Sequence, residues 1–351
     1  MPAYKNQHYV PKCYLKRFST NGSSISLFNI SSSRFIDNAA ISKQCSKGYF
    51  YGEDLNIEKG LGSLEKSYSK CIRALECGRE DEFVKDIGVV RLFCLIQYYR
   101  TRVALNRSIE YLQNMEKLFG EDDIYANVGK QSEKEIISNS IINAYGSRAT
   151  ISDLDFVVVR NNCREDFISS DDPSVLINKY YSQKFPEVSF GLASSGVVFV
   201  LPVTPRFSVI FYDSGVYRID GRKGNFVDLE RYADVVAMNM LQCLKAESNI
   251  YFRDKTNIGD IGDWFSEVEG HRVESWVNVN IGVEDPNKPG VFKVLKKDET
   301  ASGKKFLYHF EDVRAQPVKW MSFLKYRLRP KTYFDGSAMG HVRPATRGLL
   351  D

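Results

Sequence analysis

The chain has 351 residues, of which 43% are hydrophobic and 26% charged, with 48 Lys and Arg against 44 Asp and Glu. This balance is that of an ordinary folded protein and excludes disordered and fibrous classes. Seven cysteines without a CxxC spacing, and a first segment without an apolar signal core, predict a reduced, cytoplasmic protein. No apolar stretch approaches the roughly 20 residues that cross a bilayer, so we expect no membrane partner.

Basic charge gathers at the two ends of the chain. Residues 1–51 hold 7 Lys and Arg and 1 acid, and residues 301–351 hold 10 Lys and Arg and 4 acids. Lys and Arg that neutralise phosphates release counterions, so such ends favour a nucleic-acid partner. A solvated surface explains the same charge without any partner.

The first half of the chain is predicted to be mostly helical. A short helix begins at Pro11, and apolar residues on both sides of a serine turn at 31–33 predict a small hairpin. Apolar residues at helical spacing then predict helices over 57–75, over 82–119 with a break near Arg100, and over 133–145.

After Gly146 the pattern changes to short β-branched and aromatic runs. They predict strands at 156–159, 167–169, 197–203, 207–212 and 216–219, followed by a helix over 229–246. We therefore expect an α+β fold whose second half carries a mixed or antiparallel sheet. Residues 1–255 would form one domain, helical over 55–146 and strand-rich over 150–225, and residues 256–351 a basic C-terminal extension or small added domain.

Several short motifs, in order along the chain, resemble the segments of one bacterial family. They are HYVPxxYLxxF at 8–18, an acidic helix with Glu58 and Glu65, QYYRT at 97–101, SSDDP at 169–173, LPVTP at 201–205, and Asn239 with Gln242 on a late helix. The chain thus resembles the domain of unknown function 4238 family over about residues 5–255. Arg102 stands where that family often has proline. The resemblance implies a family and no particular reaction.

The matched polar residues suggest a catalytic set, with His8, Glu65, Arg100 and Asp171 as its candidates. His8 titrates near neutrality, which suits a general acid or base. The guanidinium of Arg100 matches phosphate geometry, and Glu65 with Asp171 would suit Mg²⁺ or Mn²⁺ if a metal takes part. We expect the substrate to be bound by Lys12, Lys16, Gln97 and Asn239.

Each of these residues also has a purely structural interpretation. His8 would pin the first helix through hydrogen bonds, and Arg100 with Glu65 would form a buried ion pair between helices. The loop around Asp171 has the composition of a helix N-cap or an Asx-turn. The 42 Tyr and Phe residues lie mainly at core spacing.

No P-loop, HExxH, GxSxG or kinase motif is present, which removes the commonest enzyme classes. The leading hypothesis is a bacterial nucleic-acid-cleaving effector of the toxin or phage-defence kind, acting on RNA rather than DNA. The alternative is a non-catalytic binding or sensor module for an anionic ligand or a protein partner. The sequence leaves the cofactor and the oligomeric state open.

Overall fold

The computed structural model describes residues 6–53, 55–119, 131–184, 189–253, 258–273, 275, 277–290, 292–294, 306–312, 314, 316–334 and 340–349. The helices are α1 (Lys12–Leu15), α2 (Asn56–Glu76), α3 (Glu80–Lys85), α4 (Ile87–Tyr99), α5 (Arg102–Phe119), α6 (Glu133–Gly146), α7 (Lys179–Lys184), α8 (Tyr232–Lys245) and α9 (Ile258–Glu269). The strands of the first half and centre are β1 (Asn6–His8), β2 (Ser24–Asn29), β3 (Arg34–Ala40), β4 (Ser46–Gly48), β5 (Asp155–Asn161), β6 (Ser169–Ser170), β7 (Val175–Ile177), β8 (Val198–Thr204) and β9 (Phe207–Tyr212). The later strands are β10 (Tyr217–Ile219), β11 (Phe226–Leu229), β12 (Asn249–Phe252), β13 (Val277–Glu284), β14 (Phe292–Val294), β15 (Phe306–Asp312) and β16 (Leu324–Tyr326). The chain is an α+β protein, as the sequence predicts.

A five-stranded sheet forms the centre of the fold, in the order β11-β5-β9-β8-β7. β11 runs parallel to β5 and the other neighbours are antiparallel, so the sheet is mixed. Side chains along a strand point alternately to the two faces. Phe199 and Leu201 of β8 therefore enter one core, and Val198 and Val200 enter a second core on the opposite face.

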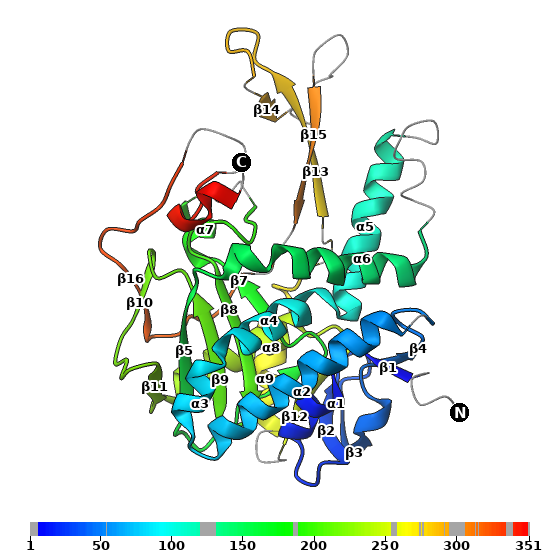
Figure 1. The fold of residues 1–351 in the computed structure, drawn as a ribbon, viewed down its shortest axis with the longest axis vertical. Helices are drawn as coiled ribbons and strands as arrows, with labels where there is room; N and C mark the ends of the chain where they lie inside the picture. The colour runs from blue at the N-terminus through cyan, green and yellow to red at the C-terminus, as the bar shows by residue number, and fades with distance from the viewer. Residues whose placement is uncertain are drawn as a thin grey trace.

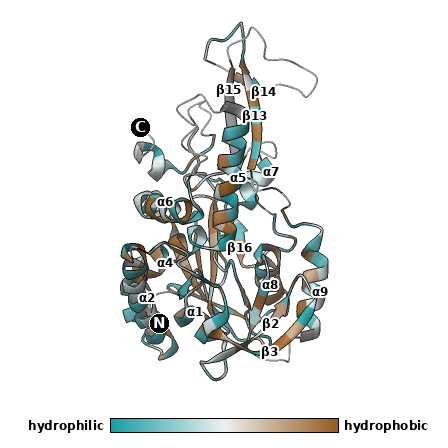
Figure 2. Ribbon diagram, turned by 90° about the vertical axis from the view of Figure 1, so that its right-hand side faces the viewer, coloured by the Kyte–Doolittle hydropathy of each residue, from teal (hydrophilic) through white to brown (hydrophobic). Residues whose placement is uncertain are grey.

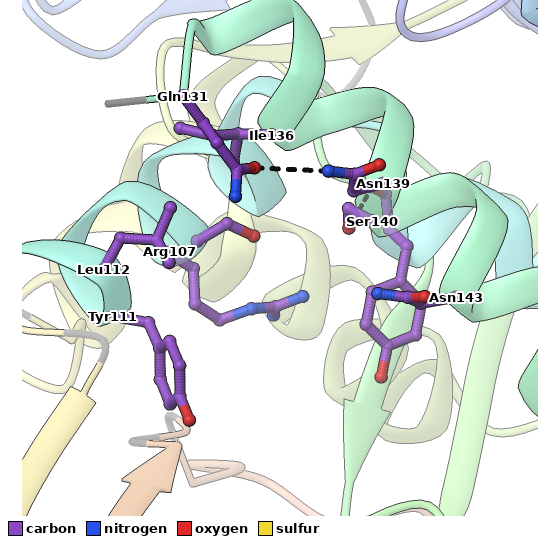
Figure 3. A pocket seen from close by; sticks show the side chains of 10 residues that line it. Arg107, Tyr111, Leu112, Gln131, Ile136, Asn139, Ser140 and Asn143 are labelled. Atoms are coloured by element: carbon purple, nitrogen blue, oxygen red, sulfur yellow. Dashed lines mark hydrogen bonds between the residues drawn. The ribbon is translucent and has the colours of Figure 1, made fainter. Parts of the chain in front are cut away.

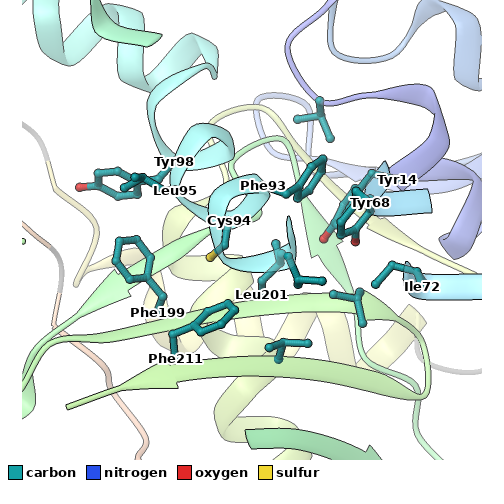
Figure 4. Packing of buried hydrophobic residues seen from close by; sticks show 14 of the residues in the cluster. Tyr14, Tyr68, Ile72, Phe93, Cys94, Leu95, Tyr98, Phe199, Leu201 and Phe211 are labelled. Atoms are coloured by element: carbon teal, nitrogen blue, oxygen red, sulfur yellow. The ribbon is translucent and has the colours of Figure 1, made fainter. Parts of the chain in front are cut away.

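Helices cover both faces of this sheet (Figures 1 and 2). On one face α2 and α4 pack together through Tyr68 and Phe93, whose stacked rings lie 3.7 Å apart. Figure 4 shows Phe93 beside Tyr14 and Tyr68, and Cys94 directed toward Phe199 and Phe211 of the sheet. α8 covers the other face, where it contributes Val235, Met238 and Leu241 to the second core.

The predicted break near Arg100 is present, and it separates α4 from α5. Thr101 Oγ1 accepts a hydrogen bond from the Ala104 N–H at 3.2 Å, as an N-cap side chain does. The same hydroxyl donates to Asp172 Oδ1 at 2.9 Å. The helix break thus places two consecutive polar residues, Arg100 and Thr101, in the protein interior.

The N-terminal segment forms the predicted hairpin, β2 with β3, which belongs to a four-stranded antiparallel sheet in the order β3-β2-β12-β6. β1 pairs with β4 and leads into α1. Pro11 has an extended backbone, with φ −70° and ψ 147°, and precedes α1 as its N-cap. The expectation that Pro11 is the first helical residue is therefore corrected by one position.

The C-terminal part has three different placements. α9 packs on α8 through a cluster that includes Trp264 and Val268. β13, β14 and β15 form an antiparallel sheet that projects from the rest of the chain at the top of Figure 1. The described residues from 316 to 349, which we call the C-terminal strap, return to the central sheet, where β16 pairs with β10. Within the described residues, no helix is both long and apolar enough to span a bilayer.

Candidate functional site

Arg100 is the centre of a polar cluster and only 1% of its side chain is exposed. It donates from Nη1 to Glu65 Oε1 at 2.8 Å, from Nη2 to the His8 carbonyl at 2.6 Å, and from Nε to Tyr51 Oη at 3.1 Å. We call Arg100, His8, Tyr51, Glu58 and Glu65 the Arg100 cluster. The structure therefore brings together three of the four predicted catalytic residues.

Local contacts explain why these side chains meet. The amide of Gln7 donates to the Gly52 carbonyl at 3.0 Å and accepts from the Tyr51 N–H at 2.7 Å, which fixes the segment after β4 beside β1. Glu58 and Glu65 are seven residues apart on α2, two helical turns, so they lie on one face. The end of α4 then supplies Arg100 from the other side.

His8 has a ring that is nearly closed to solvent. Its side chain is 7% exposed, and its Nε2 has no hydrogen-bond partner among the described residues. Burial, with the nearby charge of Lys12, lowers the pKa of His8 from 6.5 to about 4, against an opposing effect of the Ser42 and Asn6 backbone. The imidazole is consequently neutral at pH 7.

Glu58 has the opposite electrostatic tendency. Burial raises the pKa of its carboxyl group, with Glu65 adding to the effect and Arg100 and Lys12 opposing it. Its Oε2 is buried and, within the part of the chain that the structure describes, unpaired. The seven-residue spacing of Glu58 and Glu65 on a predicted helix indicates that they share a face. Glu58 was not among the site residues predicted from the sequence.

Tyr51 and Glu65 stabilise the positive charge of Arg100. Burial opposes that charge, yet Tyr51 and Glu65 together raise the pKa of Arg100 above its ordinary value. Burial also raises the pKa of Tyr51 to about 12, so its hydroxyl stays protonated and donates to the His8 carbonyl at 3.2 Å. All three donor groups of Arg100 thus bind protein acceptors, and we correct its predicted role as a phosphate clamp.

Lys12 and Lys16 are exposed at the surface of α1 and the turn after it. Lys12 affects the pKa values of both His8 and Glu58, which places its charge close to both groups. The two lysines are four residues apart, so they lie on the same side of the helical segment. They are the predicted substrate-binding residues that remain available to a phosphate.

Gln97, predicted to bind substrate, is instead fully buried. Its Nε2 donates to the Tyr9 carbonyl at 2.9 Å, which ties α4 to the residue after β1. Its Oε1 has no partner within the described structure. The amide of Gln97 is closed to solvent, so it does not meet a substrate. Its hydrogen bond to Tyr9 positions the segment that carries His8.

Asp171 lies apart from the Arg100 cluster, directly after β6, where its side chain contacts the turn between α8 and β12. Its carboxylate accepts the backbone N–H groups of Glu247, Ser248 and Asn249 at 2.8, 2.7 and 3.0 Å. Burial raises the pKa of Asp171 to about 7, although those three N–H groups favour the ionised form. These N–H groups come from a distant segment, so the carboxylate forms neither an Asx-turn nor a helix N-cap within its own loop, and the structure does not place Asp171 beside Glu65.

Asn239 and Gln242 of α8 form hydrogen bonds with the segment around Asp171. Asn239 donates to the Asp166 carbonyl at 2.9 Å and accepts from the Ile168 N–H at 3.1 Å. Gln242 donates to the Pro173 carbonyl at 3.0 Å. Asn239 is 1% exposed, so its predicted substrate contact is corrected to a structural one.

A pocket of about 370 Å³ lies between α5 and α6 (Figure 3). Arg107 extends into it, with its guanidinium 4.5 Å from the Tyr98 ring centroid and 2.8 Å from Tyr98 Oη. Tyr99, Tyr111 and the side-chain amides of Gln131, Asn139 and Asn143 complete much of the lining. The sequence gave no signal for this pocket, because its walls come from two helices joined by a long connection.

The described residues contain no group of three or more His, Cys, Asp or Glu side chains arranged to hold a metal ion. Glu58 and Glu65 are the two carboxylates of the cluster, and both interact with the charge of Arg100. They are the residues that Mg²⁺ or Mn²⁺ would meet in this cluster.

Comparison with known proteins places the chain in a family. A family model described as a protein of unknown function, DUF4238, matches residues 6–256, and the chain belongs to that family. No curated protein and no solved structure matches it. The Arg100 cluster lies wholly within the matched residues, whereas α9, β13–β15 and the C-terminal strap lie beyond them.

Proposed function

We propose that this protein cleaves RNA by acid–base catalysis at the Arg100 cluster, as a bacterial effector of toxin or phage-defence type. The observation that carries the proposal is the pair of buried, unpaired atoms His8 Nε2 and Glu58 Oε2 beside a buried arginine. Buried polar atoms are normally paired, and exceptions with displaced pKa values concentrate at functional sites.

The reaction follows from the opposite directions in which burial shifts the pKa values of the two groups. The buried Nε2 of His8 must first be opened to the RNA. Neutral His8 then accepts the proton of a ribose 2′-hydroxyl, and the oxygen attacks the adjacent phosphorus. Glu58, whose pKa is raised, donates a proton to the departing 5′-oxygen as the P–O bond breaks. Lys12 and Lys16 supply positive charge to the phosphate, and Arg100 is a positioning residue. RNA is favoured over DNA because it carries the nucleophile.

The test uses purified full-length protein and a fluorescein-labelled RNA, with DNA and 2′-O-methyl RNA of the same sequence, in Mg²⁺, Mn²⁺ and EDTA. We expect RNA alone to be cleaved, in EDTA as well as in metal. His8→Asn should lower the rate by roughly 10²–10⁴-fold, the range of a general acid or base. Glu58→Gln should have a similar effect, and the exposed control His271→Asn should have none.

Circular dichroism and thermal unfolding confirm that each variant is folded. Cleavage that survives His8→Asn at the wild-type rate would overturn the mechanism. Cleavage that needs metal and extends to DNA would replace it with hydrolysis at Glu58 and Glu65. Intact RNA under every condition would favour the alternative function, a binding module for an anionic ligand.

That alternative has one specific observation in its favour, which is the Arg107 pocket. Its volume suits a small ligand, and Arg107, Tyr99 and Tyr111 are among the residues that line it. A ligand bound there would contact α5 and α6, which also frame one side of the Arg100 region. A small molecule in this pocket would be the ligand of a binding module, or it would regulate the Arg100 cluster.

A further inference from the structure

A basic groove lies at the pairing of β10 with β16, on the left of Figure 1, whereas β1 and α1 lie on the right. It has a volume of about 770 Å³. The lining consists of Ser214, Gly215, Arg218, Arg327, Leu328, Arg329 and Lys331. The chain supplies most of this surface from the C-terminal strap, outside the residues matched by the family model.

The positive charge of the groove is only partly balanced. Arg218 pairs with Asp220 at 2.8 Å, and both side chains are about half exposed. Arg329 and Lys331 are exposed and have no acidic partner within the described part of the chain. The nearby Asp213 carboxylate is buried and accepts the Gly196 and Gly215 N–H groups.

Two cations also face each other across the strand pair. Arg218 is the register partner of Lys325, and like charges directly opposite on neighbouring strands destabilise the pairing. An anion bound between the strands and the groove would remove that repulsion. A polyanion would do so while also reaching Arg327, Arg329 and Lys331.

The backbone under these cations is held firmly. The Arg327 N–H donates to the Val216 carbonyl at 2.8 Å, and the Lys331 N–H donates to the Gly215 carbonyl at 2.9 Å. A Cβ on Gly215 would lie 3.0 Å from Asp213 Oδ1 and 3.1 Å from the Lys331 carbonyl, so the close approach needs glycine. A ligand would therefore meet a preformed row of charges, which lowers the entropic cost of binding.

We propose that this groove binds the phosphate backbone of single-stranded RNA. Arginine provides planar, paired donors that fit phosphate oxygens, and the groove is lined by three arginines and a lysine. The concave shape favours a strand lying along it over a flat lipid surface. The choice of RNA rests on the proposed function, and the groove would hold substrate away from the Arg100 cluster.

The test measures binding without cleavage. The probe is a fluorescein-labelled 2′-O-methyl RNA of about 20 nucleotides, which lacks the hydroxyl that the proposed reaction uses, and the readout is fluorescence anisotropy at several salt concentrations. We expect the triple variant Arg327→Glu/Arg329→Glu/Lys331→Glu to raise Kd at least about tenfold. The salt slope should fall by roughly 2, since each phosphate contact contributes about 0.7 in single strands.

The matched control reverses the same number of charges elsewhere, as Lys70→Glu/Arg73→Glu/Lys85→Glu on the exposed sides of α2 and α3. It should bind the probe with a Kd close to that of the wild type. Equal losses in both triple variants would show a nonspecific effect of net charge and overturn the proposal.

A second arm uses vesicles of phosphatidylserine and phosphatidylcholine, because Leu328 at the groove rim is fully exposed. Vesicle binding lost in the groove variant, with RNA binding unchanged, would overturn the proposal in favour of a membrane surface. Failure of RNA cleavage leaves this result unaffected, because the probe cannot be cleaved by the proposed reaction. The two proposals therefore fail separately.

Discussion

At the scale of single residues, burial decides what His8 can do. An exposed imidazole would be partly protonated near pH 6.5, whereas His8 is held neutral because the surrounding protein and Lys12 disfavour its charge. The same burial acts on Glu58 in the direction that favours its proton. Burial thus shifts the two pKa values in opposite directions, and in each case it favours the uncharged side chain.

The displaced pKa of His8 predicts a pH dependence of stability. Between about pH 6.5 and about pH 4 the unfolded chain binds a proton at His8 that the folded chain does not, so the free energy of unfolding falls as the pH is lowered. His8→Gln removes this titration. We expect wild type to lose more stability than His8→Gln between about pH 7 and about pH 5 in urea unfolding.

Other buried groups titrate in the same range, so the difference between the two proteins is the informative quantity. The pKa of Asp171 is raised from 3.8 to about 7 in the folded chain, so between these values the folded chain binds a proton that the unfolded chain does not. The free energy of unfolding therefore rises as the pH falls through this range. That contribution is common to wild type and variant and cancels. Parallel stability curves for the two proteins would contradict the assignment of a low pKa to His8.

At the scale of elements, Arg100 joins three parts of the fold. Its donors connect the end of α4 to α2 through Glu65, to β1 through the His8 carbonyl, and to the segment after β4 through Tyr51. The neighbouring Thr101 connects the start of α5 to Asp172, which also pairs with Lys245 of α8 at 3.3 Å. Through Arg100 and Thr101, the break between α4 and α5 therefore joins these helices to α2, to the N-terminal segment and to the loop that contains Asp172.

Removing the guanidinium should be costly. Arg100→Met leaves the Glu65 carboxylate and the His8 carbonyl without their donors, and loss of one partner of a buried pair typically costs about 3–5 kcal/mol. The free energy of unfolding of Arg100→Lys should lie between those of wild type and Arg100→Met, since lysine keeps the charge and lacks the forked donors of the guanidinium. Urea unfolding measures both values.

The control for this prediction is an exposed pair. Arg79 and Glu82 form an ion pair whose side chains are half exposed. Arg79→Met should change the free energy of unfolding by less than about 1 kcal/mol. Equal losses for Arg79→Met and Arg100→Met would show that burial of the Arg100 cluster contributes little.

At the scale of the whole molecule, the C-terminal strap completes the domain that precedes it. Met321, Phe323 and Leu324 belong to the same core as Val216 and Tyr217. Further along, Arg343 is 1% exposed and donates to Asp153 Oδ2 at 2.7 Å and to the Leu192 carbonyl at 2.6 Å. The extension therefore shares its core with the family domain.

A fragment ending at residue 256 should lack the side chains that the strap adds to that core, Met321, Phe323 and Leu324, and the cover that α9 gives to α8. Each large apolar side chain taken from the core forfeits about 1.5–3 kcal/mol, and typical domains have only about 5–15 kcal/mol in total. We expect the fragment to bind a hydrophobic dye and to unfold without a cooperative transition. A transition at the melting temperature of the full chain would contradict this view.

The full chain provides a milder version of the same test. Arg343→Met leaves the Asp153 carboxylate and three carbonyl groups without their donor while keeping the strap. It should remain folded and lose about 3–5 kcal/mol. Comparison with the fragment separates the effect of one ion pair from the loss of the whole segment.

The sequence by itself determined the elements whose pattern is local. Apolar spacing of three and four predicted α2, α6 and α8, and continuous apolar runs predicted β8 and β9, because these periods reflect which side of a helix or strand is buried. The motif residues also identified the family and most of the Arg100 cluster. Short strands such as β7 and β12 escaped, since three or four residues carry too little periodicity.

Only the tertiary structure decided which polar residues meet. Asp171 and Glu65 have the same carboxylate chemistry, yet one accepts backbone N–H groups at the turn before β12 and the other pairs with Arg100. The partnership of β10 with β16 joins residues more than a hundred positions apart. Such contacts depend on the packing of distant elements, and no local pattern records them, so the contacts within the site and the basic groove became visible only in the folded chain.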